Sequence, residues 1–275
     1  MKADDRDIAE YVELNGFCSN EDLVQHFDVS EMTIRRCLDR LETAGRVTRV
    51  RAGAIPGTRQ RGYGRGLVDN LFREKEQKIA IARNALTLLR GKRTVFLDTG
   101  STCFHLAHLI PDTTELTVIT HSLDIVAALR RKRNIRVICP GGELDNTLNV
   151  FAGPHAERLL ATFSADASFL GVGALDVESG TQENVIVQIP IKTIMNRNAT
   201  ESYLLADSTK FGRRSYFDGI PITELKTIVT TSLTDPAHLD ALEAKGLRVE
   251  VVPCEGCYEG ASEGSQMGAP GSVTQ

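Results

Sequence analysis

Three short segments within the first 45 residues carry apolar residues at helical spacing. Ser19 or Asn20 can cap the second segment, Ser30 can cap the third, and Ala44-Gly45 can end it. The apolar positions are Ile8, Tyr11, Val12 and Leu14 in the first segment, Leu23, Val24 and Phe27 in the second, and Ile34, Cys37, Leu38 and Leu41 in the third. This spacing predicts three short helices.

The pattern after Gly45 is that of a small hairpin. Residues 46–51 alternate between polar and apolar side chains, as a half-buried strand does. Ala52-Gly53 can turn the chain and Ala54-Ile55 can return it. Three helices and a hairpin therefore form a predicted first domain, residues 1–56, and the glycine- and arginine-rich stretch 57–73 is predicted to be a linker.

Beyond the linker, short apolar strands alternate with helices. The predicted strands are 94–97, 116–119, 135–139, 167–171, 203–205, 227–229 and 248–252, and the predicted helices are 78–89, 101–109, 122–131, 155–163, 190–199 and 236–245. This alternation predicts an α/β domain over residues 74–253 with a doubly wound, mostly parallel sheet. The acidic, glycine-rich residues 254–275 are predicted to be a disordered tail.

The charge of the chain is unevenly distributed. Residues 30–65 contain nine arginines and three acidic residues, a net charge of +6, whereas the whole chain carries -4. Arginines on a helix face are often only solvated, but here the third helix, the hairpin and the linker all carry the same sign. A helix with a basic face fits the major groove and a basic hairpin can lie along the phosphates, so we expect double-stranded DNA as a partner.

Composition indicates the cellular location of the protein and the state of its cysteines. The N-terminus has acidic residues where a secretory signal would be basic, and the sequence has no run of eighteen apolar residues, so we expect a cytoplasmic protein without a membrane partner. The six cysteines lie mostly in apolar runs and are expected to be reduced and buried. Cys254 and Cys257 have the spacing of a metal or redox pair, but a second pair is lacking and a strand end is the simpler interpretation, so no metal or cofactor is predicted.

Polar or glycine-rich loops follow five of the predicted strands. In doubly wound sheets ligands bind beyond the carboxyl ends of the strands, so these loops are expected to converge. The loops contain residues 98–102, 120–122, 140–143, 171–173 and 207–210. The first of them places a glycine and hydroxyl side chains before a helix, where backbone N–H groups can hold a phosphate. The sequence lacks a Walker-type lysine and a GxGxxG motif, so a small anion is favoured over a nucleotide.

The run SEMTIRRCLDRLETAGRVTRVRAGA resembles the winged helix-turn-helix of DeoR-type bacterial repressors, in which the recognition helix reads S-x-x-T-I-R-R-D-L-x-x-L and the wing R-V-H-G-G-A. Cys37 stands where the family has Asp, Arg51 where it has His, and Ala52 where it has Gly. The DNA contacts implied by this resemblance come from Thr33, Arg35, Arg36, Arg49 and Arg51.

The second half is similar to the DeoR-type sensor domain, which resembles ribose 5-phosphate isomerase in fold and binds phosphorylated sugars or related metabolites. The segments DTGST and ADSTKFG are the most specific, and the two resemblances together cover about residues 5–232. The resemblance implies that residues 99–102 hold the phosphate. The predicted effector site comprises Asp98, Thr99, Gly100, Ser101, Thr102, His121, Gly141, Gly142, Lys192, Asp207 and Lys210. His121 replaces a usual Asn, Gly173 often an Asp, and Thr193 an Arg.

These observations predict a sequence-specific DNA-binding regulator, a repressor of carbohydrate metabolism genes whose operator affinity is controlled by a phosphorylated sugar. One three-helix module reads only a short half-site, so a homo-oligomer is expected. One alternative is a sugar-phosphate isomerase with Asp98 or Asp207 as the base, although Gly173 removes a candidate carboxylate. The other is a DNA-binding protein whose second domain binds no ligand.

Overall fold

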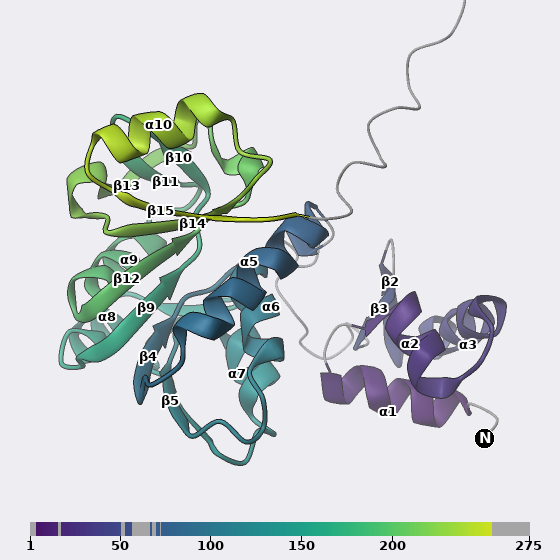
Figure 1. Cartoon of the computed structure of the whole chain (residues 1–275). Helices are drawn as coiled ribbons and strands as arrows, with labels where there is room; N and C mark the ends of the chain where they lie inside the picture. Colours follow the sequence, from purple (N-terminus) through teal and green to yellow (C-terminus); the bar gives the residue numbers. More distant parts are fainter. Residues whose placement is uncertain are drawn as a thin grey trace, which may run out of the picture.

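The structure is a computed structural model that describes residues 4–15, 18–50, 53–56, 67, 70–71 and 73–254. Figure 1 shows an N-terminal module of helices with a small sheet and a larger α/β module. The N-terminal helices are α1 (Asp5–Asn15), α2 (Asn20–Phe27) and α3 (Glu31–Thr43), and its strands are β1 (Cys18–Ser19), β2 (Val47–Val50) and β3 (Gly53–Pro56). The predicted helices and hairpin are confirmed, and β1 is an addition.

Capping side chains begin two of these helices where the sequence predicts. Ser19 accepts a hydrogen bond from the N–H of Asp22 (3.0 Å), and Asp22 accepts one from the N–H of Ser19 (2.9 Å), which is a capping box at α2. Ser30 accepts from the N–H of Thr33 at the start of α3. The apolar faces of α1, α2 and α3 then pack together with Val47 and Ala54 of the hairpin.

The small sheet depends on one glycine. Strand β3 lies between β1 and β2, with Cys18 opposite Ala54 and Ser19 opposite Gly53. A Cβ atom at position 53 would lie 2.1 Å from the carbonyl oxygen of Cys18. Only glycine therefore allows β1 to approach β3 this closely.

Among the residues that the structure describes, the larger module is built on a parallel sheet in the order β15-β14-β12-β9-β4-β5-β6. These strands are β4 (Thr94–Leu97), β5 (Leu116–Ile119), β6 (Ile135–Ile138), β9 (Ala165–Leu170), β12 (Ala199–Leu205), β14 (Thr227–Thr231) and β15 (Arg248–Val252). The helices between them are α5 (Lys75–Leu88), α6 (Ser101–Leu109), α7 (Leu123–Leu129), α8 (Pro154–Leu160), α9 (Gln188–Arg197) and α10 (Pro236–Ala244). The doubly wound, mostly parallel α/β fold is confirmed.

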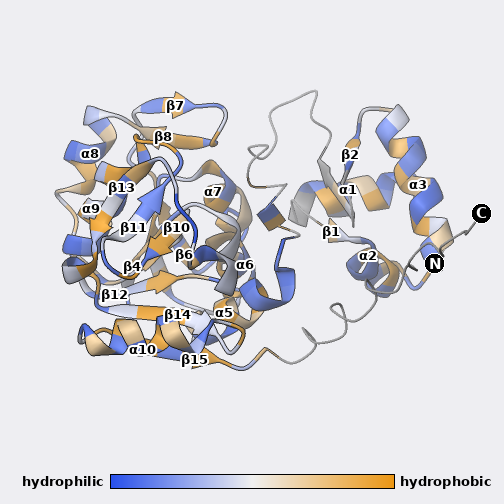
Figure 2. Ribbon diagram, turned by 90° about the horizontal axis from the view of Figure 1, so that it is seen from above, coloured by the Kyte–Doolittle hydropathy of each residue, from blue (hydrophilic) through white to orange (hydrophobic). Residues whose placement is uncertain are grey.

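Two separate hydrophobic clusters show that helices cover both faces of the sheet. Residues of α5, α6 and α7 pack with Val95, Leu97 and Phe169 on one face. Residues of α8, α9 and α10 pack with Phe96 and Leu170 on the other. Because neighbouring residues of a strand point to opposite faces, the continuous apolar runs of β4 and β9 serve both layers. In Figure 2 the central strands of this module are largely hydrophobic, whereas α3 alternates between hydrophobic and hydrophilic stripes.

The strand order places a topological switch point between β4 and β9. From β4 the chain adds β5 and β6 on one side, and then returns to the other side of β4 with β9, β12, β14 and β15. The loops that follow β4 and β9 therefore leave the sheet in opposite directions and open a crevice between them. The sheet topology alone thus gives the location of a ligand site.

Short antiparallel strands add two pieces that the pattern analysis missed. β7 (Glu143–Asp145) pairs with β8 (Val150–Ala152), while β11 (Gly180–Glu183) lies between β10 (Ala174–Asp176) and β13 (Phe217–Pro221). The 3-10 turns η1 (Ser208–Lys210) and η2 (Ile222–Glu224) were also missed. The prediction of a helix over 190–199 and a strand over 203–205 was misplaced, because α9 ends at Arg197 and β12 already begins at Ala199.

Several sequence predictions concern residues outside the described ranges. These are Arg51, Cys257, most of the linker and the tail from residue 255 onward. Cys18, Cys37, Cys103 and Cys139 are free thiols, whereas Cys254 is disulfide-bonded, which corrects the expectation of reduced cysteines at that position. Within the described residues, none of the helices is long and apolar enough to cross a membrane.

Candidate DNA interface and effector site

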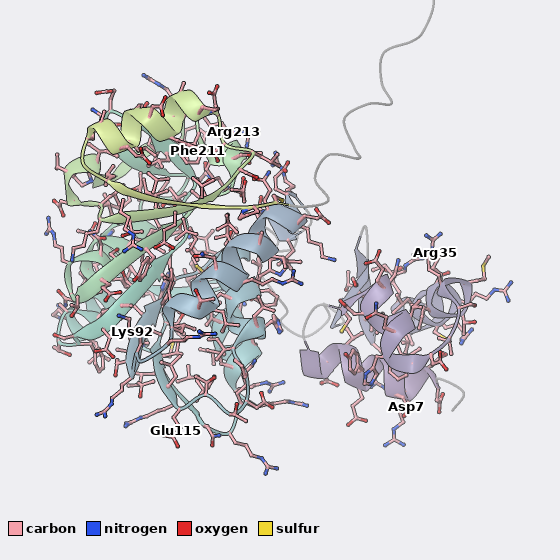
Figure 3. All side chains as sticks on the ribbon, in the orientation of Figure 1. Asp7, Arg35, Lys92, Glu115, Phe211 and Arg213 are labelled. Atoms are coloured by element: carbon pink, nitrogen blue, oxygen red, sulfur yellow. The ribbon has the colours of Figure 1, made fainter. Side chains whose placement is uncertain are left out.

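Helix α3 presents an arginine-bearing face away from its buried stripe. Ile34, Leu38 and Leu41 are buried against α1 and α2, whereas Arg35 and Arg36 are exposed. Figure 3 shows Arg35 pointing away from the N-terminal module. Arg35 donates a hydrogen bond to Glu31 at 2.7 Å, and both side chains are more than half exposed, so this pair holds the guanidinium only weakly.

Thr33 is exposed as well, but its side chain takes part in the cap of α3. The hydroxyls of Ser30 and Thr33 lie 2.9 Å apart. Thr33 therefore stands at the helix N-terminus, where its hydroxyl and the nearby backbone N–H groups could both meet a DNA phosphate.

Arg40 faces the body of the N-terminal module rather than the exposed side of α3. Its guanidinium donates two hydrogen bonds to the carboxylate of Asp5, at 2.7 and 2.6 Å, and one to Cys37 Sγ at 3.2 Å. The hydrogen bond from Arg40 lowers the pKa of Asp5 below its ordinary value. This bidentate contact joins α1 to α3 beside Cys37, the position where the DeoR-type pattern has an acidic residue.

The wing is attached to α3 through Arg49. The Arg49 guanidinium donates to the carboxylate of Asp39, and its backbone N–H donates to Glu42 Oε1 at 2.8 Å. Arg49 is thus partly neutralised in the free protein, and a DNA phosphate would compete with Asp39 for it. Arg51, the other predicted wing contact, lies outside the described residues.

A cavity of about 230 Å³ lies at the switch point of the sheet in the larger module. Its lining includes residues 99–102 after β4, residues 171–173 after β9, and Lys210 after β12. Thr147 and Leu148 form another part of the wall. The structure thus brings together residues 99–102, which are predicted to hold a phosphate, and the Lys210 loop, as the sequence predicts loops at the carboxyl ends of parallel strands to do.

The first turn of α6 is open toward a ligand. Gly100 is the N-cap with φ 105°, and it offers no side-chain hydrogen bond to the helix. The backbone N–H groups at a helix start carry a partial positive charge, and here they are not covered by a capping side chain. A Cβ atom at Gly171 would lie 2.9 Å from the carbonyl oxygen of Thr99, so glycine at position 171 lets the β9 loop approach this turn closely.

Asp98 lies beneath the cavity and not in its lining. Its carboxylate is fully buried, lies 3.0 Å from Lys192 Nζ, and accepts a hydrogen bond from the N–H of Gly171 at 3.0 Å. Lys192 Nζ also lies 2.9 Å from Glu183 Oε1 and donates to the carbonyl oxygen of Gly171 at 2.7 Å. Two carboxylates and one ammonium therefore form a buried cluster at the cavity floor, of which Lys192 and Glu183 line the cavity and Asp98 does not.

The protonation of this cluster follows from its contacts. Burial alone would lower the pKa of Lys192, but the carboxylates of Asp98 and Glu183 outweigh burial and raise it above its ordinary value. Burial raises the pKa of Glu183. Lys192 stays charged, donates a hydrogen bond to the carbonyl oxygen of Gly171, and is itself part of the cavity lining.

His121 is also fully buried and does not line the cavity. Its Nε2 lies 3.9 Å from Asp98 Oδ1, too far for a hydrogen bond. Burial lowers the pKa of His121 to about 4, so the imidazole is neutral at physiological pH. His121 supports the Asp98 side of the cluster and is not positioned to contact a ligand in the cavity.

Of the remaining predicted site residues, some line the cavity and others lie outside its lining. Lys210 lines the cavity, whereas Asp207 lines an adjoining one and caps η1 by accepting a hydrogen bond from the N–H of Thr209 at 3.1 Å. Gly141 (φ 65°) and Gly142 (φ 113°) lie in neither lining. A Cβ atom at Gly142 would lie 2.7 Å from the carbonyl oxygen of Ala152, which gives this glycine a packing role beside β8.

Glu183 is a cavity residue that sequence reasoning did not single out. It ends β11, and its side chain lies beside Gly173: a Cβ atom there would be 3.4 Å from Glu183 Oε2 and 2.7 Å from the carbonyl oxygen of Gln182. The carboxylate that the DeoR-type pattern often has at position 173 is absent, and β11 brings another one to the same wall. The only sequence signal was the polar segment GTQE, which has no period that would mark it as a strand.

Comparison with known proteins identifies the family. The model of the DeoR-like helix-turn-helix domain matches residues 5–60, and that of the DeoR C terminal sensor domain matches residues 73–232. The chain belongs to the DeoR family. The two matches coincide with the N-terminal module and with most of the larger α/β module, so the DeoR resemblance found in the sequence extends over both.

Relatives of this DeoR-family chain are named as regulators. It is 33% identical to the HTH-type transcriptional regulator YulB of Bacillus subtilis, over 90% of this chain and 95% of the relative. It is 33% identical to the HTH-type transcriptional regulator GlpR of Haloferax volcanii (89% and 95%) and 26% identical to the glycerol-3-phosphate regulon repressor of Escherichia coli (89% and 96%). The chain is therefore a DNA-binding transcriptional regulator and not an enzyme.

Among solved structures, the ribose 5-phosphate isomerase A of Methanocaldococcus jannaschii matches with 16% identity and a TM-score of 0.38. The match covers 50% of this chain and 54% of that one.

Proposed function

We propose that this DeoR-family regulator is a repressor of carbohydrate metabolism genes whose operator affinity is controlled by a phosphorylated sugar. The observation that carries the proposal is the cavity at the switch point, where the uncapped first turn of α6 and the side chain of Lys210 line one space. Backbone N–H groups, the helix dipole and a compact ammonium together are suited to a phosphate dianion.

The names of relatives support the proposed ligand class. Two relatives are called the glycerol-3-phosphate regulon repressor and the lactose phosphotransferase system repressor. Another is called the L-fucose operon activator, so relatives with both directions of control match this chain.

The DNA-binding half of the proposal assigns Thr33, Arg35 and Arg36 to the major groove and Arg49 and Arg51 to the wing contacts. The capped start of α3 supports Thr33, and the exposure of Arg35 and Arg36 supports the other two helix contacts. Arg49 would exchange Asp39 for a phosphate on binding.

A titration of labelled operator DNA with the full chain tests the proposal. Operator fragments are first selected from genomic DNA, and anisotropy is then measured with and without a panel of sugar phosphates. A coupling of about 1 to 3 kcal/mol, or roughly 5- to 150-fold in affinity, is expected for the effector. Lys210→Ala should bind operator normally and lose the response, whereas Lys245→Ala, at an exposed lysine that pairs with Glu178, should respond as the parent does.

Two results would contradict the proposal. If none of the sugar phosphates alters operator binding and none raises the melting temperature of the protein, the second domain is a ligand-free interaction domain. If Lys210→Ala responds as the parent does, the cavity is not the sensing site. A ligand at 100 times its dissociation constant should add about 2.7 kcal/mol to the free energy of unfolding, which a thermal shift assay detects.

We also propose that the regulator acts as a homo-oligomer on a repeated or palindromic operator, because one winged module reads only a short half-site. Light scattering of the full chain, together with a footprint on the selected operator, tests this. A monomer at working concentration that protects a single half-site would show the proposal to be wrong.

A further inference from the structure

A second cavity adjoins the first and differs from it in charge. It measures about 250 Å³, and Asn70, Gly173, Asn184 and Lys210 line both cavities. The two volumes together fall in the range of about 300 to 1,000 Å³ that ligand pockets usually occupy. The cationic residues around the second cavity are Arg73, Lys78, Lys210, Arg213 and Arg214, and its one acidic lining residue is Asp207.

Most of these cations make no direct ion pair with the described residues. Among the residues that the structure describes, the side chains of Arg73, Lys210, Arg213 and Arg214 make no hydrogen bond or ion pair. Lys78 is 2% exposed, and its ammonium donates only to the carbonyl oxygens of Asn70 and Arg73, at 2.6 and 2.5 Å. Five like charges around one carboxylate repel one another, so an anion placed among them would be strongly stabilised.

The first cavity is less positive. Its Lys192 lies beside the carboxylates of Asp98 and Glu183, which balance its charge. Anion binding in the first cavity rests on the first turn of α6 and on Lys210. The lining therefore offers two places for anionic groups, one at a helix start and one among unpaired cations.

Between these places the shared wall is polar. Gly173 has no side chain, and a Cβ there would meet the carbonyl oxygen of Gln182 at 2.7 Å, so another residue at this position would require a shift of β11. Asp207 is 1% exposed, and its Oδ2 has no hydrogen-bond partner among the described residues. Such an oxygen in a cavity wall is suited to accept a hydrogen bond from a sugar hydroxyl.

We propose that the effector is a sugar with two phosphate groups, one on the first turn of α6 and the other among Lys78, Arg73, Arg213 and Arg214, with Lys210 between them. This inference rests on the function proposed above and narrows its ligand class. Figure 3 shows Arg213 at the edge of the larger module, close to Phe211, where a ligand that enters from solvent can reach it. Burial lowers the pKa of Lys210 and of Lys78, which an adjacent phosphate would reverse.

Isothermal titration of the full chain with three probes tests the proposal. The probes are fructose 1,6-bisphosphate, and the fructose monophosphates that carry only one of its two phosphate groups. The bisphosphate should bind at least about tenfold more tightly than either monophosphate, because each extra charge-assisted contact is worth about a factor of ten or more. Arg213→Gln/Arg214→Gln should reduce that advantage by at least about fivefold, whereas the matched surface variant Arg131→Gln/Arg133→Gln should retain it.

The outcomes separate this inference from the proposed function. If a monophosphate binds and alters operator affinity while the bisphosphate has no advantage, the second anion site is wrong and the proposed function stands. If none of the sugar phosphates of the wider panel binds, both are wrong. If Arg213→Gln/Arg214→Gln keeps the bisphosphate advantage but loses operator affinity in the absence of sugar, these arginines belong to the DNA-binding surface, and the inference fails.

Discussion

Lys192 lies between two buried carboxylates and a carbonyl oxygen, and this position determines what the side chain can do. The side chain is 5% exposed and its three contacts lie between 2.7 and 3.0 Å. Removing one partner of a buried ion pair leaves the other charge uncompensated in a medium of low polarity, which is more costly than losing an exposed pair. We therefore expect Lys192 to have a structural role in the cavity floor, in addition to the effector contact that the DeoR-type resemblance implies.

Substitution of two lysines distinguishes these roles. Lys192→Met should lower the free energy of unfolding by about 3 to 5 kcal/mol, because Asp98 and Glu183 lose their counter-charge. Lys210→Met should change it by less than about 1 kcal/mol, since the Lys210 ammonium makes no hydrogen bond or ion pair with the described residues. Urea denaturation followed by circular dichroism measures both values. Equal stability of the two variants would refute the structural role of Lys192.

Asp124 gives the larger module a dependence on pH. Its carboxylate accepts a hydrogen bond from Asn149 at 2.6 Å, next to the wall residues Thr147 and Leu148, and burial raises its pKa to about 7. Because the folded pKa lies above the unfolded value, the contribution to stability is fully present below about pH 4 and is lost as the pH rises through 7. Asp124→Asn should not lose stability in this way as the pH rises. The melting temperature of this variant should exceed that of the parent at pH 8 and match it at pH 4.5. A parent-like profile would contradict the assignment.

At the level of elements, the N-terminal module is held together by arginines that pair with acidic residues of neighbouring elements. Arg40 joins α3 to α1 through Asp5, and Arg49 joins the wing to α3 through Asp39. Arg35 and Arg36 remain on the exposed side of α3. The arginines of the N-terminal module thus form two groups. Arg40 and Arg49 connect its elements, whereas Arg35 and Arg36 are placed to contact a DNA groove.

Two alanine variants test this division. Arg36→Ala should reduce the slope of log affinity against log salt by about one, because a free arginine that neutralises a phosphate releases a counterion. Arg40→Ala should leave the slope within error of the parent and lower stability only slightly, as its pair is largely exposed. Operator binding at several salt concentrations measures the slopes. A drop of one unit in the Arg40→Ala slope would instead make Arg40 a phosphate contact.

Elements with a clear apolar period could be predicted from the sequence, and those without one could not. The bounds of β4, α6 and β5 match the prediction because each is a short apolar run between polar or glycine residues. Strand β11 is the segment GTQE. It is buried because it lies between β10 and β13, and its polar composition does not predict this burial. The residues that follow β4 were predicted correctly as part of the cavity. The contact between Glu183 and Lys192 could not be predicted, because it joins two separate elements, β11 and α9, and the local residue pattern does not report contacts between elements.

At the scale of the whole molecule, a sensor and a DNA-binding module in one chain must obey thermodynamic linkage. If a sugar phosphate changes operator affinity by a given factor, operator DNA changes sugar phosphate affinity by the same factor. We therefore expect the dissociation constant of the effector, measured by titration with and without saturating operator, to shift by the factor found in the DNA experiment. If operator DNA leaves the dissociation constant of the titrated site unchanged while the sugar phosphate alters operator affinity, the sugar phosphate acts on DNA binding through a different site.

The burial of Lys78 has a consequence for the conditions under which the regulator responds. Burial lowers the pKa of Lys78 to about 8, with Asp207 and Glu74 opposing the shift and Lys210 and Arg73 adding to it. A phosphate bound beside Lys78 favours the ammonium form, so near pH 8 effector binding should draw a proton from the buffer. Calorimetry at pH 8 in two buffers of different ionisation enthalpy should then give different apparent heats, and affinity should fall as the pH rises above 8. The same metabolite concentration would thus produce a weaker response in a more alkaline cell.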